Sequence, residues 1–168
     1  FKYKPLIAAC VLILVGIILF GGAMTVLKWD FKKLSTVTYE NRRHEISDDF
    51  RNISINADTA DIVFALSDTD TCIVECYEET NVTHSVSVQD HALVIENKDT
   101  RAWYEHIVIF TVTPSITIYL PKSDFGALSV KGSTGDIEVP KSFTFESTDI
   151  SISTGDINYF APTQKTVK

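Results

Sequence analysis

The phrase Ser-Thr-Gly-Asp-Ile occurs twice near the C-terminus, beginning at Ser133 and again at Ser153, twenty residues later. The apolar residues around the phrase repeat as well. A shift of twenty pairs Phe125 with Phe145, Val130 with Ile150, Ile137 with Ile157 and Val139 with Tyr159. Such self-similarity is typical of a stacked repeat, in which each unit buries its apolar face only against its neighbours.

A third copy lies upstream, where residues 50–64 match residues 125–139 at an offset of 75. The short apolar runs between the turns alternate at period two and are rich in β-branched and aromatic residues. The residues expected to face inward have even numbers before each turn, as Val130 does, and odd numbers after it, as Ile137 does. Such a change is expected where the chain turns a corner between two short strands of one coil. We therefore predict an all-β fold, a parallel β-solenoid of about twenty residues per coil, with Ile137 stacked over Ile157 and an irregular interruption between Asp99 and Pro114.

An uncharged apolar run covers residues 5–27. As a helix it is long enough to span a bilayer core of about 30 Å, although a cleaved signal peptide, with a shorter apolar region, is the alternative. We predict a single transmembrane helix before the β domain. The expected organisation is a membrane anchor at 1–34 with its helix at about 5–28, a polar stalk at 35–49, and an extracytoplasmic β-solenoid at 50–168. An irregular first strand is the alternative for the stalk segment.

Charge separates the two parts of the chain. From Leu34 onward there are ten Lys and Arg against twenty-one Asp and Glu, a net charge of −11. Nucleic acid is excluded as a partner because phosphate binding needs a basic face. The lipid bilayer is the expected partner of the helix, and the protein is expected in the cell membrane as a single-pass protein. The lysines on either side of the helix do not fix its orientation.

The repeated turns allow two interpretations. Stacked Gly-Asp turns bind calcium in some β-rolls, which makes Asp61, Asp136 and Asp156 weak calcium candidates. In the structural alternative, Gly135 and Gly155 supply a backbone angle that other residues resist, and the aspartates accept amide hydrogens. We favour the structural role and predict no cofactor.

The two cysteines outside the helix, Cys72 and Cys76, are four residues apart on one strand, too far for a disulfide. They lack nearby metal-ligand partners in the sequence, so buried packing is expected. The histidines, which include His84 and His91, show no ligand spacing and are expected at surface or hydrogen-bonded positions. The scattered acidic residues contain no distinctive pair, and the protein is expected not to be an enzyme.

The segment Ser115–Lys122 (SITIYLPK), followed by the Gly-Asp-Ile turns and preceded by a single membrane helix, resembles the "putative adhesin" family of β-strand-repeat proteins, including LiaG-like membrane-anchored proteins of Gram-positive bacteria. The similarity covers about residues 50–160. The resemblance implies a β-solenoid outside the cytoplasm and a link to cell-envelope stress or membrane complexes. It supplies no catalytic residues.

Two functions remain. The first is an accessory or interaction subunit of a cell-envelope membrane complex, such as a transporter or stress-sensing system, whose helix packs against an integral membrane protein. The second is an adhesin-like module that binds cell-wall polymer or a surface ligand. A polysaccharide-active enzyme is the least favoured alternative. The candidate partner-binding residues are Gly16, Gly21, Gly22, Trp29, Trp103 and Tyr104.

Overall fold

A computed structural model describes residues 3–30, 37–102 and 112–167. The chain divides into two compact units, a helical unit at the N-terminus and a β domain that begins at Val37. The helical unit contains helix α1 (Lys4–Val26). The β domain contains all the strands of the described residues. Trp103 and Tyr104, expected as exposed aromatic contacts, lie outside the described residues.

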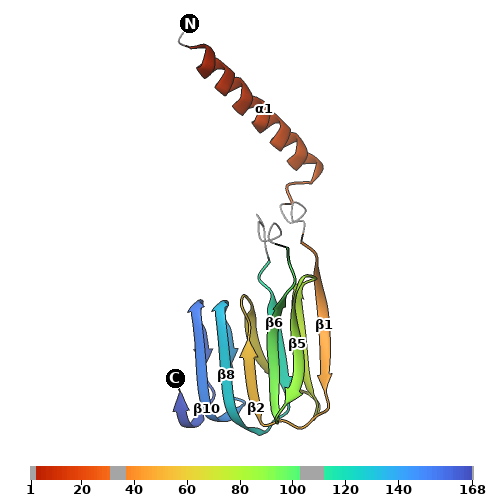
Figure 1. Ribbon diagram of the computed structural model, residues 1–168, viewed down its shortest axis with the longest axis vertical. Coiled ribbons are helices and arrows are strands. Elements are labelled where there is room, and N and C mark those ends of the chain that lie inside the picture. Colours follow the sequence, from red (N-terminus) through yellow and green to blue (C-terminus); the bar gives the residue numbers. More distant parts are fainter. Residues whose placement is uncertain (1–2, 31–36, 103–111, 168) are drawn as a thin grey trace. The chain divides into compact units, whose positions relative to one another are not determined.

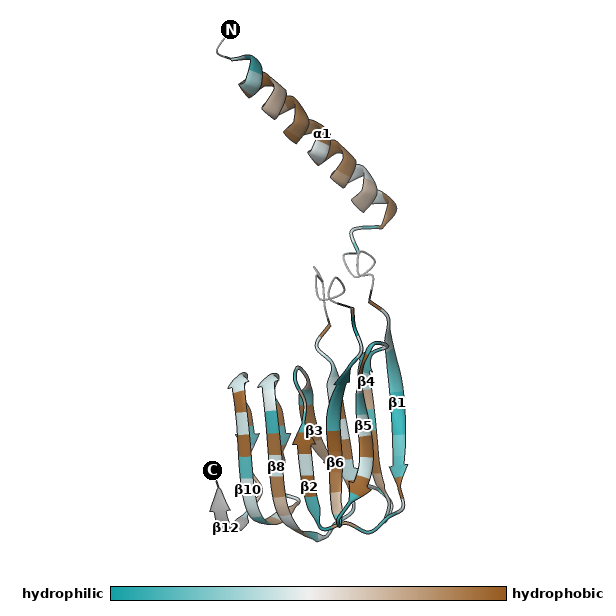
Figure 2. Ribbon diagram, in the orientation of Figure 1, coloured by the Kyte–Doolittle hydropathy of each residue, from teal (hydrophilic) through white to brown (hydrophobic). Residues whose placement is uncertain are grey.

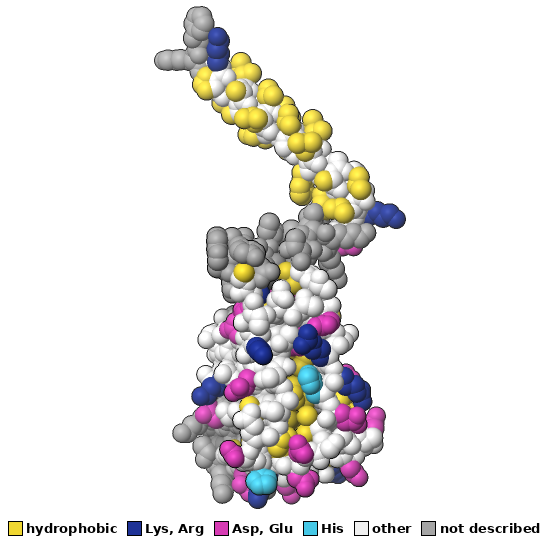
Figure 3. All heavy atoms as spheres, turned by 45° about the vertical axis from the view of Figure 1, so that its right-hand side comes forward, with side chains coloured by type: hydrophobic (Ala, Val, Ile, Leu, Met, Phe, Trp, Pro, Cys, Tyr) yellow, Lys and Arg dark blue, Asp and Glu magenta, His cyan; other side chains and the backbone are white. Residues whose placement is uncertain are grey.

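Helix α1 has no polar face, since its only charged residue is Lys4 at its first position, and the sides visible in Figures 2 and 3 are largely apolar. Its 23 residues give a length of roughly 34 Å at 1.5 Å per residue. Leu12 and Leu19 are 72% and 68% exposed. By length and composition this is one helix able to cross a membrane, as a signal anchor or a single span. It ends where Lys28 and Trp29 adopt left-handed backbone angles, with φ of 54° and 59°.

One mixed sheet of twelve strands forms the β domain. The strands are β1 (Tyr39–Ile46), β2 (Asn52–Asn56), β3 (Asp61–Leu66), β4 (Cys72–Glu79), β5 (Val82–Gln89), β6 (Ala92–Asp99), β7 (Ser115–Leu120), β8 (Asp124–Thr134), β9 (Ile137–Val139), β10 (Thr144–Thr154), β11 (Ile157–Tyr159) and β12 (Thr163–Val167). Their order in the sheet is β11-β9-β3-β7-β4-β5-β6-β2-β8-β10-β12, and β1 pairs with β4.

The sheet curls into two halves that face each other (Figure 1). One half contains β4, β7, β3, β9 and β11, and the other contains β5, β6, β2, β8, β10 and β12. The fold line lies between β4 and β5, which share a single register pair, Glu79 with Val82. The apolar side chains of both halves meet in one core, where Phe64 of β3 and Phe145 of β10 lie edge to face with ring centroids 6.5 Å apart.

The register of the repeats is as predicted. Ile157 pairs with Ile137 in parallel strands, and Phe145 pairs with Phe125. The sequence offset of 75 also corresponds to strand pairing, because Ile55 of β2 pairs with Val130 of β8. Each of the strand pairs β2–β3, β8–β9 and β10–β11 passes from one half to the other around a turn. The echoed residues of the sequence are therefore neighbours in adjacent strands.

The prediction that the whole domain is a parallel β-solenoid is not confirmed, because the sheet is mixed. Strand β4 runs antiparallel to β1, β5 and β7, and β5 runs antiparallel to β6. Two of these antiparallel pairs are hairpins. The turn Thr80-Asn81 connects β4 to β5, and the turn Asp90-His91 connects β5 to β6. Asp90 and His91 both have positive φ, 48° and 59°, as a type I′ hairpin turn requires. The dipeptide Asp-His is an uncommon carrier of this turn, so the sequence did not reveal it.

Residues 35–49, expected as a stalk, contribute strand β1 along most of their length. Strand β1 pairs with β4 from Tyr39 opposite Glu79 to Ile46 opposite Cys72. Its half-buried positions include Glu40, Arg42 and His44. Because these residues are polar, the hydropathy alternation that marks a strand is missing, and the segment resembles a loop in the sequence.

The turns stack with almost no space between them. A side chain added at Gly135 would place its Cβ 2.0 Å from the carbonyl oxygen of Ala60, and one added at Gly155 would lie 2.0 Å from that of Gly135. Both glycines have left-handed backbone angles, with φ of 140° and 130°. The backbone amide of Gly135 donates to Thr154 O at 3.0 Å, which ties the two turns together. The predicted structural role of Gly135 and Gly155 thus has a geometric basis.

Replacing Gly155 with alanine is expected to lower the free energy of unfolding by about 1–3 kcal/mol or more, because strained backbone and a carbonyl clash combine. Urea titration of the full chain in mild detergent, followed by circular dichroism, measures the change. Gly22→Ala is the matched control, since a Cβ at Gly22 meets nothing within 4 Å. Equal stability of the two variants would contradict the stacking argument.

Candidate functional site

The inward face of the fold line is polar, although the rest of the core is apolar. Glu78 of β4 is fully buried at 0% exposure, and His84 of β5 is buried at 4%. Glu78 Oε2 lies 2.7 Å from His84 Nδ1 and accepts the backbone amide of His84 at 2.8 Å. Strand alternation places Glu78 inside, two residues after Cys76 and four after Val74. The side chains that join the two halves of the curl here are therefore a carboxylate and an imidazole.

Cys76 completes a group of three potential ligands. One ligand atom from each of Cys76, Glu78 and His84 lies within 4.8 Å of the others, and all three residues are buried. Burial, with Glu78 nearby, raises the pKa of the Cys76 thiol to about 12, while Arg42 opposes this shift. Both cysteines are free and buried, in agreement with the sequence analysis. The expectation that Cys76 lacks metal-ligand neighbours is wrong, because Glu78 and His84 adjoin it.

Two atoms of this group have no hydrogen-bond partner in the described residues, Glu78 Oε1 and His84 Nε2. Asn97 Oδ1, also buried and without a partner there, belongs to the residue directly opposite His84 in the β5–β6 ladder. An unsatisfied buried polar group costs about 1–3 kcal/mol. The polar end of the core therefore has more hydrogen-bonding and ligating capacity than its own residues use.

Arg42 of β1 approaches the group from the edge. Its Nε lies 3.6 Å from Glu78 Oε1. The guanidinium also bonds Glu40, with Nε 2.9 Å from Glu40 Oε1. The charge of Arg42 is thus shared between two carboxylates, and that of Glu78 is only partly balanced by it.

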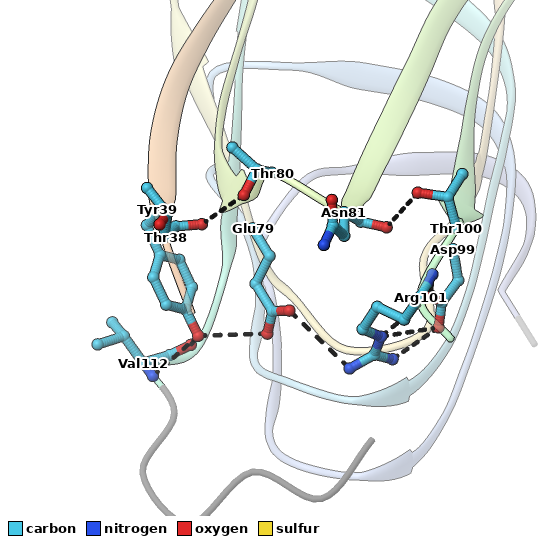
Figure 4. A network of polar contacts seen from close by, with 9 residues as sticks. All are labelled: Thr38, Tyr39, Glu79, Thr80, Asn81, Asp99, Thr100, Arg101 and Val112. Atoms are coloured by element: carbon cyan, nitrogen blue, oxygen red, sulfur yellow. Dashed lines mark hydrogen bonds and ion pairs between the residues drawn. The ribbon is translucent and has the colours of Figure 1, made fainter. Parts of the chain in front are cut away.

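A second polar network surrounds Glu79 at the same end of the sheet (Figure 4). Tyr39 Oη donates to Glu79 Oε1 at 3.3 Å, and Arg101 forms an ion pair with Glu79 at 3.9 Å. Arg101 also bonds Asp99 through two nitrogens. Tyr39 Oη contacts the backbone of Val112 as well. The network therefore fixes the chain on both sides of residues 103–111.

An open groove of about 300 Å³ lies on the outer side of the sheet. Arg43, Glu75 and Tyr119 are among the residues that line it. The Arg43 and Glu75 side chains pair with each other at 2.8 Å, and Asp68 is the third charged residue that lines the groove.

The aspartates considered for calcium form a ladder of hydrogen bonds. Asp61 Oδ1 accepts the backbone amide of Asp136 at 2.9 Å, and Asp136 Oδ1 accepts that of Asp156 at 2.9 Å. In the described part of the chain these aspartates do not belong to any group of three ligands within reach of one ion. The carboxylates thus bond the amide of the next turn, a role between units that the sequence analysis described only as local.

The candidate partner-binding residues do not form one site. Gly16, Gly21 and Gly22 lie on α1 with nothing within 4 Å of an added Cβ. Trp29 follows α1 and is 56% exposed.

Sequence reasoning missed Glu78, His84 and Arg42 as a group. Glu78 and Cys76 alternate with the core residue Val74 in β4, so a buried carboxylate was visible as a charge at an inward position. Recognising His84 as its partner requires the Thr80-Asn81 hairpin, which brings residues 78 and 84 together.

Asp136→Ala is expected to lower the free energy of unfolding by about 1–2 kcal/mol, because the amide of Asp156 loses a charge-assisted acceptor. Asp136→Asn retains an acceptor oxygen and should cost less. Thermal melts of both variants, with calcium and with a chelator, measure this. A calcium-dependent rise in melting temperature that Asp136→Asn removes would contradict a purely structural role.

Stability at alkaline pH depends on Cys72, because burial raises the pKa of its thiol from 9.0 to about 12. The unfolded thiol ionises first, so this contribution to stability is intact below about pH 8.5 and declines as the pH rises toward the folded value. Urea titrations between pH 8 and pH 11 should show a steeper loss for the wild type than for Cys72→Ala. Parallel losses would refute the assignment.

One family model matches most of the β domain. A family model described as Toastrack DUF4097 matches residues 50–165. Among solved structures, the chain is similar to a "putative adhesin" from Bacteroides fragilis, with 18% identity, a TM-score of 0.47, and coverage of 75% of this chain and 60% of that chain. A "putative adhesin" from Parabacteroides distasonis shows 15% identity, a TM-score of 0.44, and coverage of 73% and 56%.

A "putative cell adhesion protein" from Clostridium sporogenes shows 8% identity, a TM-score of 0.37, and coverage of 77% of this chain and 100% of that chain. No curated protein matches the sequence significantly. The chain thus spans 60% and 56% of the length of the first two structures. Because the family model covers more than half of the chain, including every echoed turn, the protein belongs to the Toastrack DUF4097 family.

Proposed function

We propose that this protein is a membrane-anchored, non-enzymatic, adhesin-like module whose β domain lies outside the cytoplasm and binds a cell-wall polymer or a surface ligand. Helix α1 serves as the anchor in this proposal. The parallel part of the sheet, β2–β3, β8–β9 and β10–β11, acts as a short, rigid solenoid-like stack. The observation that carries the proposal is a regularly spaced polar surface on that stack.

This surface, the polar face, consists of the outward side chains of β2, β8 and β10: Ser54, Asn56, Ser129, Lys131, Asp149 and Ser151. They are in register, since Ser54 pairs with Ser129 and Ser129 with Asp149. Adjacent strands in a sheet lie about 4.8 Å apart. The polar face therefore repeats short hydroxyl, amide and charged groups at a fixed spacing, which suits a ligand with repeating polar groups.

Charge narrows the ligand class. The chain carries twenty-two acidic against fifteen basic residues, and the excess of acid belongs to the β domain. A strongly anionic polymer would be repelled at long range. A neutral glycan strand fits better, because hydroxyl and amide groups recognise it without charge pairing.

The absence of catalysis in this proposal is supported by where the reactive groups lie. Cys76, Glu78 and His84 are buried, and the ion pair of Arg43 and Glu75 occupies the described groove. A general acid or base must reach substrate to act.

A specific observation favours a second candidate, the accessory subunit of a membrane complex. Gly16, Gly21 and Gly22 leave open space on α1, and small residues allow close helix packing in a bilayer. The helix would then dock on an integral membrane protein, and the β domain would project from that complex.

The test is co-sedimentation of the full chain, held in lipid nanodiscs, with purified cell-wall sacculi. Ser129→Glu on the polar face should weaken binding about tenfold, equivalent to 1.4 kcal/mol. Thr117→Glu is the matched control, since Thr117 is equally half-buried on the outward side of β7 in the other half of the sheet. The control variant should bind like the wild type.

Equal binding by both variants would contradict a role for the polar face, and no sedimentation of the wild type would contradict wall binding. The accessory reading is tested in parallel by purification in mild detergent. It requires a stoichiometric membrane partner that is lost when residues 5–27 are replaced by an unrelated apolar helix.

A further inference from the structure

The polar end of the core provides three different metal-binding groups in one place. Cys76 and Glu78 project inward from β4, and His84 faces them from β5 across the fold line. Their ligand atoms lie within 4.8 Å of one another. Bonds to zinc are about 2.0–2.3 Å long, so small shifts of the side chains would bring the thiol, the carboxylate and the imidazole within reach of one ion.

An independent observation points to a missing ligand. Glu78 Oε1, His84 Nε2 and Asn97 Oδ1 are buried and without hydrogen-bond partners in the described residues. Asn97 is the register partner of His84, so its amide lies on the same side of the ladder. Buried polar atoms are normally satisfied. Of the four such atoms in the described residues, three belong to this group or to the residue opposite His84, and the fourth, His44 Nε2, lies on β1 opposite Val74.

The donor set selects the class of ion. Calcium and magnesium prefer oxygen ligands, and a sulfur and a nitrogen donor suit them poorly. Zinc and similar borderline ions accept sulfur, nitrogen and oxygen together. For both side chains to bind one ion, the contact between His84 Nδ1 and Glu78 Oε2, at 2.7 Å, would be replaced by a bond from each side chain to the ion.

The charges nearby are compatible with a divalent cation. Arg42 is the closest described cation, with Nε 3.6 Å from Glu78 Oε1, but its guanidinium is also paired with Glu40. Binding would release the thiol proton of Cys76 to solvent, with the sulfur–metal bond replacing the sulfur–hydrogen bond. The resulting thiolate and the Glu78 carboxylate balance the two positive charges of the ion.

We propose that Cys76, Glu78 and His84 form a binding site for a zinc-class divalent ion, which joins the two halves of the curled sheet at the fold line. This proposal does not depend on the polar face or on the binding of a polymer. The site differs from the calcium hypothesis in its residues, in its place in the fold and in the class of ion.

The test uses the full chain in mild detergent, without a histidine tag and with Cys10→Ser, so that the only thiols are Cys72 and Cys76. After chelator treatment, zinc alone is titrated in competition with a chromophoric chelator, and cobalt is titrated separately to detect a thiolate-to-cobalt charge-transfer band. We expect one equivalent of ion, the thiolate band, and a rise in melting temperature with zinc.

Cys76→Ser and His84→Gln should each weaken zinc binding by more than about tenfold. Cys72→Ser is the matched control, because Cys72 is a buried thiol on the same face of β4 but outside the ligand group. It should bind zinc within about twofold of the parent chain. Equal weakening by Cys72→Ser and Cys76→Ser would overturn the proposal. So would a parent chain that binds less than one equivalent or shows no thiolate band, a result that needs no variant to fold.

Discussion

Successive turns of the repeat lie so close together that a backbone carbonyl occupies the place where the first side-chain carbon would stand. This applies at Gly135 against Ala60 and at Gly155 against Gly135. Only glycine satisfies both the contact and the left-handed backbone angle. Asp136, which follows Gly135, accepts the backbone amide of Asp156 in the next turn, just as Asp61 accepts that of Asp136. Register, strand direction and the alignment of Ile137 with Ile157 all depend on this stacking.

The apolar and polar parts of the interior have different functions in the fold. Phe64 and Phe145 hold the two halves of the sheet together by apolar packing that is tolerant of small changes in side-chain direction. At the fold line, Glu78 and His84 replace this packing with a directional contact between a carboxylate and an imidazole. Directional contacts specify geometry more strictly than apolar ones, and a buried group without a partner is costly. The fold line is therefore where the sheet is most specific in its chemistry.

The repeated part of the fold was predictable from the sequence because each unit is built on its neighbour. Identical positions in adjacent strands carry similar residues, so offsets of 20 and 75 in the sequence became registers in the sheet. The antiparallel strands do not repeat similar residues at a fixed offset in the sequence. They depend on the two-residue turns Thr80-Asn81 and Asp90-His91, whose residues are not the usual ones for hairpins. The grouping of Glu78 with His84 follows from the first of those turns. Strand β1 was expected only as an alternative to a stalk, because its inward residues are polar.

Strand β2 has β6 on one side and β8 on the other, and its pairing with β8 joins residues 75 positions apart. The segment between them holds the locally connected hairpins, which close short loops at little entropic cost. We infer an order of assembly in which the β4–β6 meander forms first and β2 keeps an unpaired edge until β8 has been synthesised. An unpaired strand edge is a template for pairing with other chains. A nascent chain of this protein is therefore most exposed to misassembly during the interval before its last third leaves the ribosome.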